Sequence, residues 1–265
     1  MNETRWPRLP AMTGFAALLS GAAAVALERP WPSTSDPAAF PAFLADNRDA
    51  VLAQSMLFLL SAGLFMWFLG VLRSFLIEAE GATGRLSTLA FTAGMIGYGM
   101  NVVGQAPQIT LTLPSAHSMT PGSATTLTDL GWVLLVVANI PLAVMFFAIA
   151  VVSLRTRVFP VWLGWLAVVA GVAAVLLSFA LVFPAGPLAP QGWASYLLYP
   201  ASIIWLVPAA TVMVRRTGSS TGRGLRDRGL FPSDRRFGRA GSGATPRIRS
   251  FGPAGSVPPS TRWRD

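Results

Sequence analysis

Amide side chains interrupt one of the longest apolar runs of this chain, at Asn101, Gln105 and Gln108 in "GYGMNVVGQAPQITL". Spacings of four and three residues place all three amides on one face of a helix. An amide surrounded by apolar groups needs a hydrogen-bonding partner, so we expect these side chains to point toward neighbouring helices. The pattern predicts either a polar binding stripe inside a membrane or a set of hydrogen bonds that joins or ends helices.

Residues able to support catalysis are few. The chain has no cysteine and one histidine, His117, so thiol chemistry is excluded and a histidine-based metal site is disfavoured. Glu78 and Glu80 could form a carboxylate pair for acid–base work, but Arg73 and Arg85 lie close by and favour an interfacial charge cluster. We therefore expect a protein that is not an enzyme and that needs no metal or cofactor.

The elements that position these amides are predicted to be membrane-spanning helices. The chain of 265 residues is 53% apolar and only 12% charged, against about 25% charged residues in soluble domains. Apolar runs near twenty residues long match a bilayer core of about 30 Å. We predict an all-α bundle of six spans, at Leu9 to Leu27, Ala50 to Ile77, Leu86 to Leu111, Leu130 to Leu154, Val161 to Phe183 and Trp193 to Val214.

Arginine placement sets the orientation of these spans. The N-terminus, the second and fourth links and the C-terminal tail all carry arginine, whereas the third link has none and the fifth has no charge. Arginines in short links favour the cytoplasmic side. We therefore expect a multi-pass protein of the cytoplasmic membrane with both termini in the cytoplasm. No intramembrane ionisable group lies at mid-depth, which disfavours proton-coupled transport.

The first span has a second interpretation. "MNETRWPRLPAMTGFAALLSGAAAVA" combines a basic start, an apolar middle and a small-residue ending, which is also typical of a cleaved signal peptide. Cleavage would leave five spans with the later topology unchanged. We favour an uncleaved span because the apolar run is nineteen residues long and the remainder of the chain is a bundle.

The outer links carry helix-start signals. In "SDPAAFPAFLADN", Asp36 is a plausible N-cap with Pro37 at the first helical position, which predicts a short helix lying on the outer membrane surface. A plain loop is the alternative, because Pro41 weakens the helix. Asp129 is expected to cap the fourth span.

Small residues mark the faces on which the helices should pack, because close approach drives helix association in lipid. Prolines within spans predict kinks, at Pro107, Pro141, Pro200 and Pro208. The small residues recur at helical spacing in the first, third and fifth spans, at Gly14, Ala17 and Gly21, at Gly94, Gly97 and Gly104, and at Ala167, Gly171, Ala174 and Ser178.

The depth of the polar groups predicts a pocket. At about 1.5 Å per residue, Asn101 lies roughly 22 Å above the cytoplasmic start of its span. The other intramembrane polar groups also fall in the outer half. We predict a polar pocket that opens outward, with Asn101 and Asn139 at its floor and with Gln54, Gln105, Ser178 and Tyr199 around it. The alternative remains that these amides only join or end helices.

The C-terminal tail differs from the predicted spans in charge and composition. Residues 215 to 265 hold twelve arginines and three acidic residues, which accounts for the whole net charge of +9, together with nine glycines, seven serines and five prolines. Such a segment cannot bury enough apolar surface to fold alone, so we expect disorder. Arg215, Arg216 and Arg223 directly follow the last span and should contact anionic lipids. Arginines interleaved with aromatic residues keep nucleic-acid binding as an alternative, and docking to a protein as another.

Two segments carry a family resemblance. "LRSFLIEAEGATGRLSTLAFTAG" (Leu72 to Gly94) and "VFPVWLGWLAVVAGV" (Val158 to Val172) resemble six-span integral membrane proteins of high-GC bacteria, chiefly actinobacteria, that are described as a domain of unknown function. The resemblance covers roughly residues 10 to 214 and implies six spans. It supplies no catalytic or binding residue.

These observations lead to two functional hypotheses. The first is a non-enzymatic membrane component that binds an unknown protein or small-molecule partner from its outer side. The second is a permease for a small neutral solute. A permease needs access to its site from both membrane faces in turn, which separates the two hypotheses experimentally.

Overall fold

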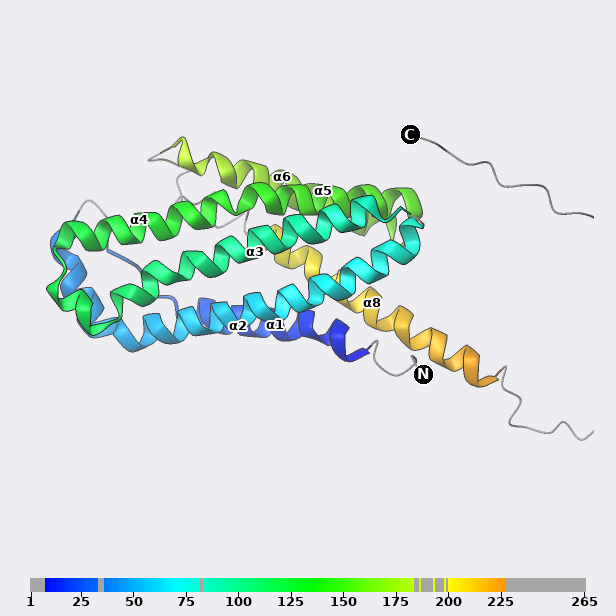
Figure 1. Cartoon of the computed structure of the whole chain (residues 1–265), viewed down its shortest axis with the longest axis horizontal. Helices are drawn as coiled ribbons and strands as arrows, with labels where there is room; N and C mark the ends of the chain where they lie inside the picture. Colours follow the sequence, from blue (N-terminus) through cyan, green and yellow to red (C-terminus); the bar gives the residue numbers. More distant parts are fainter. Residues whose placement is uncertain are drawn as a thin grey trace, which may run out of the picture.

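The computed structural model describes residues 8–32, 36–81, 83–183, 186, 193, 198 and 200–226. Within these ranges the protein consists of helices and connecting turns without a strand, so the all-α prediction is confirmed (Figure 1). Three short 3-10 helices lie between the α-helices: η1 (Pro37–Ala39), η2 (Pro114–Ser118) and η3 (Phe179–Leu181). The α-helices are α1 (Arg8–Ala26), α2 (Phe40–Glu80), α3 (Arg85–Leu111), α4 (Pro121–Val137), α5 (Asn139–Thr156), α6 (Val161–Ser178) and α8 (Pro200–Arg226).

The helices close into a ring. Successive neighbours α1, α2 and α3 pack in order, α3 packs on α5, and α5 packs on α6 (Figure 1). Helix α8 then contacts both α6 and α1 and completes the ring. Helix α4 continues almost in line with α5 and covers the remaining length of α3. Each helix of the ring therefore packs against a neighbour on either side and has one face directed away from the bundle.

The outward faces are apolar, as a lipid environment requires. Large hydrophobic side chains with more than half of their surface exposed include Leu60 and Trp67 on α2, Ile96 on α3 and Val169 on α6. Among the described residues, four segments are long and apolar enough to cross a membrane: Phe40–Glu80, Arg85–Leu111, Pro121–Thr156 and Val161–Leu181. The apolar parts of the other two helices are shorter, at Met12–Ala26 and Ile203–Arg215. The length and composition of the four segments are those of a multi-pass membrane protein.

Helix α2 is longer than its predicted span. It runs unbroken through 41 residues, about 62 Å at 1.5 Å per residue. The predicted separate helix on the outer surface is therefore wrong: residues from Phe40 onward are the first turns of α2 itself. Pro41 does not interrupt this helix because it occupies the first turn, where a missing N–H costs nothing.

Helix α4 also begins earlier than predicted. It starts at Pro121, and the Thr120 hydroxyl accepts a hydrogen bond from the Ser123 N–H at 3.3 Å. Asp129 lies inside α4 and does not cap it, so that prediction is wrong. The Thr-Pro pair at the start is the usual N-cap and first-turn combination.

A small apolar cluster explains both extensions. Phe40 from α2, Leu111 from α3 and Ala124 from α4 are buried together, and Trp31 and Leu44 pack against them. The Trp31 and Phe43 rings also lie 5.0 Å apart. This cluster lies beyond the predicted spans and holds the ends of α2, α3 and α4 together on the predicted outer side.

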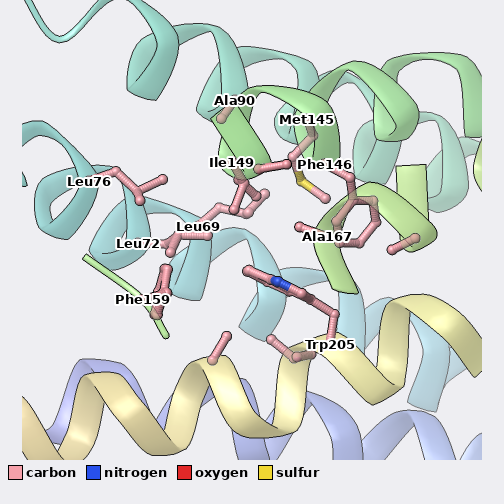
Figure 2. Close-up of a cluster of buried hydrophobic side chains, with 14 of the residues drawn as sticks. Leu69, Leu72, Leu76, Ala90, Met145, Phe146, Ile149, Phe159, Ala167 and Trp205 are labelled. Carbon is pink, nitrogen blue, oxygen red and sulfur yellow. The ribbon is translucent and has the colours of Figure 1, made fainter. Parts of the chain in front are cut away.

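The main core lies toward the opposite end, around Trp205 of α8. Its side chain is 1% exposed, and its ring lies 5.6 Å from the Phe146 ring and 6.3 Å from the Phe159 ring (Figure 2). The ring centres of Phe159 and Phe75 of α2 also lie 5.2 Å apart. Leu69, Leu72 and Leu76 of α2 and Met145 and Ile149 of α5 fill the space above.

Glycines permit the close helix contacts, as predicted. A methyl group at Gly94 would lie 2.7 Å from the Met145 Sδ atom, and one at Gly97 would lie 2.7 Å from Leu142. A methyl group at Gly171 would meet the Phe147 ring at 2.8 Å, and one at Gly14 would meet the Phe68 ring at 2.9 Å. These positions form the α3–α5, α5–α6 and α1–α2 contacts, because only glycine leaves room for the facing side chain.

The prolines and the end of α8 differ in part from the predictions. Pro107 and Pro208 lie inside α3 and α8, whereas Pro200 begins α8 instead of kinking it. Pro141 lies just after Ala138, where α4 ends and α5 begins. Helix α8 continues past Val214 to Arg226, so the first residues of the predicted disordered tail are helical. The rest of that tail, residues 227–265, lies outside the described residues.

Candidate functional site

Two of the predicted pocket residues are buried without a hydrogen-bond donor. Gln54 of α2 is 3% exposed and Gln105 of α3 is 6% exposed. The Oε1 atom of each has no partner among the described residues. Leaving a buried acceptor unpaired costs about 1–3 kcal/mol. These two oxygens are therefore buried acceptors of the predicted site that a donor group could satisfy.

The two glutamines lie at a similar depth. Ser55 follows Gln54, and its hydroxyl donates to the Gln108 Oε1 atom at 3.4 Å. Gln105 precedes Gln108 by one turn of α3. A layer of polar side chains from α2 and α3 thus crosses the bundle near its predicted outer end. We call Gln54, Ser55, Gln105 and Gln108 the amide layer.

The two asparagines have a structural role. Asn101 Nδ2 donates to the Gly97 carbonyl at 3.3 Å, within α3. Asn139 Nδ2 donates to the Leu135 and Val136 carbonyls at 3.2 Å, across the break between α4 and α5. A methyl group at Gly97 would lie 3.2 Å from the Ala138 carbonyl oxygen, so both amides serve the same α3–α5 crossing. The Asn101 donor is used within α3, and the Asn139 donor is used on the last turn of the preceding helix α4, so both have a structural partner.

The remaining predicted pocket residues are not joined to the amide layer. The Ser178 hydroxyl donates to the Ala174 carbonyl at 2.9 Å, one turn earlier in α6. Tyr199 lies outside the described residues. The sequence therefore identified two amides with unpaired buried acceptors and three polar groups that donate to backbone carbonyls one turn earlier in the chain.

Helix α3 is capped at both ends by α2, which the sequence analysis missed. At the outer end, Arg48 Nε donates to the Thr112 carbonyl at 2.8 Å. At the inner end, the Glu80 carboxylate accepts from the Leu86 N–H at 2.9 Å and from the Ser87 N–H at 2.8 Å. A cation at a helix C-terminus and an anion at its N-terminus both complement the helix dipole.

The environment of Glu80 favours its charged form. Glu80 lies beyond the predicted apolar span, which ends at Ile77. Partial desolvation acts to raise the pKa of Glu80, but hydrogen bonds from the Ser87 hydroxyl, at 2.6 Å, and from backbone N–H groups outweigh it and hold that pKa below its ordinary value. The acceptors of the Glu80 carboxylate are therefore occupied by hydrogen bonds from the first turn of α3.

The predicted charge cluster at this turn is not a network of ion pairs. Within the described ranges, the ion pair formed is Arg48 with Asp49, at 3.1 Å. The Arg73 guanidinium lies 5.7 Å from the Phe91 ring centre and donates to the Thr88 hydroxyl at 3.5 Å. Arg85 is exposed at the first position of α3. Both arginines are free to bind an anion.

A narrow apolar crevice lies behind Arg73, between α2 and α3, and it has no room for a water molecule. Most of its lining is buried, and Arg73 and Phe91 are its half-exposed members. No residue of the predicted outer pocket contributes to it. The lining residues are Leu69, Leu72, Arg73, Leu76, Ser87, Ala90, Phe91 and Ile149.

The remaining predicted contacts can be placed only in part. Arg215 is exposed on α8, and Arg216 and Arg223 lie within the same helix. No cluster of three or more histidine, cysteine or acidic side chains suited to a metal ion occurs among the described residues. No protein-family model, curated protein or solved structure matches the chain.

Proposed function

We propose that the protein is a non-enzymatic, six-span component of the cytoplasmic membrane that recognises a small neutral ligand, or a polar group of a partner protein, from the outer side. The observation that carries this proposal is the pair of buried, unpaired oxygens, Gln54 Oε1 and Gln105 Oε1. A group that donates N–H or O–H hydrogen bonds would remove the cost of leaving them unpaired.

The six-span count is supported by the way α1 joins the bundle. The Ser20 hydroxyl donates to the Leu57 carbonyl at 2.9 Å, and the Ser61 hydroxyl donates to the Ala17 carbonyl at 2.8 Å. These reciprocal bonds between α1 and α2 favour a retained span over a cleaved signal peptide. Peptides from α1 should therefore be found by mass spectrometry in the purified membrane protein.

The predicted sixth span, which begins at Trp193, is described only in part. Trp205 lies near Phe159 of the α5–α6 turn, so the start of α8 is already deep within the bundle. The apolar part of α8, Ile203–Arg215, is too short to cross a bilayer alone. Residues 194–197 and 199 of the predicted span lie outside the described residues.

Access to the amide layer tests the proposed site. The chain has no cysteine, so single cysteines can be introduced without a background. Gln54→Cys and Gln105→Cys should react with a membrane-impermeant maleimide added outside intact cells. Ala90→Cys is the matched control, because Ala90 is as buried as Gln54, at 3% exposed, but lies toward the other end of the bundle; it should not react. Lack of reaction at both glutamine positions would exclude an outward site.

A permease for a small neutral solute is the second candidate. The break at Ala138, with Pro141 just after it, is the observation that favours it, because interrupted helices line the sites of many transporters. Asn101→Cys and Asn139→Cys would then be labelled from both membrane faces, whereas labelling from outside only would favour a binding component.

The inner face is proposed to contact anionic lipids. Arg215, Arg216 and Arg223 follow the apolar part of α8 and would lie at the cytoplasmic surface under the proposed orientation. Nucleic-acid binding by the arginine-rich tail remains the alternative. Membership of the actinobacterial family that two segments resemble also remains a prediction.

A further inference from the structure

We propose that the inner ends of α2 and α3 form a specific site for one anionic phospholipid, whose phosphate is bound by Arg73, Arg85 and the Thr88 hydroxyl. One acyl chain would lie against Phe91 at the mouth of the crevice between these helices. This site is separate from the C-terminal arginines. Only its assignment to the inner leaflet depends on the orientation in the proposed function.

The first argument is the supply of unpaired positive charge. Arg73 and Arg85 have no ion-pair partner among the described residues, because Glu80 is committed to the backbone of α3. A guanidinium has five N–H donors in a planar fork that matches phosphate oxygens. Arg73 uses one contact on Thr88, so several of its donors remain for an anion.

The second argument is the placement of these groups. Arg73 touches Thr88, and Arg85 lies one turn before Thr88 on the same face of α3. The Phe91 ring, one turn after Thr88, holds the Arg73 guanidinium at 5.7 Å. The two cations and the hydroxyl therefore converge where the predicted apolar span ends, at the depth of lipid headgroups.

The third argument is the apolar crevice behind the cations. Its buried lining comes from leucines of α2, Ala90 of α3 and Ile149 of α5, and it opens past Arg73 and Phe91. A soluble phosphate would use the arginines alone. A phospholipid would use the arginines and the apolar mouth together, and anionic phospholipid is concentrated at the membrane surface where this site lies. We therefore assign the site to a lipid.

The test is lipid binding to the purified full-length protein in detergent, followed by native mass spectrometry. Phosphatidylglycerol should form a one-to-one adduct more tightly than phosphatidylcholine. The Arg73→Gln/Arg85→Gln double variant should bind phosphatidylglycerol about twenty-five-fold more weakly, from roughly fivefold for each arginine near an anionic group. Arg155→Gln/Arg157→Gln, which removes two exposed arginines at the other inner turn, should bind within about twofold of the wild type.

Several outcomes would overturn the proposal. Equal binding by the double variant and the wild type would remove the arginines from the site. Equal losses in the two double variants, Arg73→Gln/Arg85→Gln and Arg155→Gln/Arg157→Gln, would indicate a diffuse charge effect. Competition by inorganic phosphate as effective as that by the lipid would show a soluble anion site. Arg73→Lys/Arg85→Lys should recover part of the affinity, which guards against misfolding of the glutamine variant.

The result does not depend on the proposed ligand of the amide layer. Detergent solution has no leaflets, so an inverted topology would leave the one-to-one adduct unchanged. Failure of outward labelling at Gln54 and Gln105, with lipid binding intact, would reject the proposed function alone.

Discussion

The two ends of the bundle leave different kinds of polar group unpaired. At the predicted outer end, amides enter the interior, and two of their oxygens stay without donors. At the predicted inner end, the interior is aromatic and aliphatic, and the buried Trp205 Nε1–H has no acceptor among the described residues. Unpaired buried groups cost stability at both ends, so the difference is that the outer end offers acceptors to a ligand, whereas the inner donor is enclosed by aromatic side chains.

The same contrast holds for charge. Helix α2 supplies a cation to one end of α3 and an anion to the other, each with the sign that complements the helix dipole. At the outer end the cation Arg48 is used in this way and also pairs with Asp49. At the inner end the anion Glu80 is used, which leaves Arg73 and Arg85 available. The inner end therefore attracts anions, whereas the outer end offers neutral acceptors.

The largest expected effect is the loss of the inner core. Trp205→Ala removes the side chain on which Phe146 and Phe159 pack, and should lower the free energy of unfolding by about 3–5 kcal/mol. Trp67→Ala, at a 66% exposed position on α2, is the matched control and should change it by less than about 0.5 kcal/mol. Thermal unfolding followed by circular dichroism in detergent would measure both. Equal effects would mean that the inner end is not the stabilising end.

Apolar substitutions in the amide layer should raise the free energy of unfolding or leave it unchanged, whereas Trp205→Ala should lower it. Gln54→Leu and Gln105→Leu remove unpaired buried acceptors, so each should leave stability unchanged or raise it by about 1–3 kcal/mol in the absence of ligand. The same unfolding measurement applies. A loss of more than about 1 kcal/mol in either variant would show that the amide has a structural partner, and the contrast between the two ends would disappear.

The stabilisation that Glu80 gives to the start of α3 should decrease at acidic pH. The folded-state pKa of Glu80 is below its ordinary value, so its stabilisation is complete above the unfolded-state pKa and is lost as the pH falls through the folded value. Glu80→Gln should lower stability by about 1 kcal/mol at neutral pH and should reduce the loss on acidification. Unfolding curves at pH 7 and at pH 3 would show this, and an identical pH dependence in both proteins would contradict it.

The outer cap should contribute least. Arg48→Gln removes the guanidinium from the Thr112 carbonyl at an exposed position, which should cost about 0.3–1 kcal/mol and diminish in high salt. Denaturation at low and high ionic strength would measure the effect. A loss larger than that of Glu80→Gln would reverse the expected order of the two ends.

The sequence predicted the helices best where the thickness of a bilayer sets the length of the apolar run. Apolar runs of bilayer length predicted α1, α3 and α6 closely, and also the end of α5, because a helix must satisfy its own backbone in lipid. The break that divides the predicted fourth span into α4 and α5 was not predicted. The starts of α2 and α4 were missed because the cluster of Phe40, Leu111 and Ala124 joins three segments far apart in the chain. The Thr120–Pro121 start of α4 did carry a readable capping signal.

The site was harder to predict because hydrogen-bond partners depend on packing. Helical spacing identified the amides, but it could not show that Asn101 and Asn139 donate to backbone carbonyls while the oxygens of Gln54 and Gln105 stay unpaired. Proximity in sequence suggested that Glu80 pairs with arginine, yet the free N–H groups at the start of α3 are better placed to bind it. The Arg48–Thr112 bond joins residues too distant in sequence for any local pattern.

The orientation of the two ends is the central claim, and one labelling experiment tests it most directly. Ser115→Cys lies in the exposed η2 turn beside the amide end, and Glu78→Cys is exposed at the inner turn. In intact cells, a membrane-impermeant maleimide should react with the cysteine at position 115, and with that at 78 only after permeabilisation. Reaction at 78 alone, or at both positions in intact cells, would contradict the account.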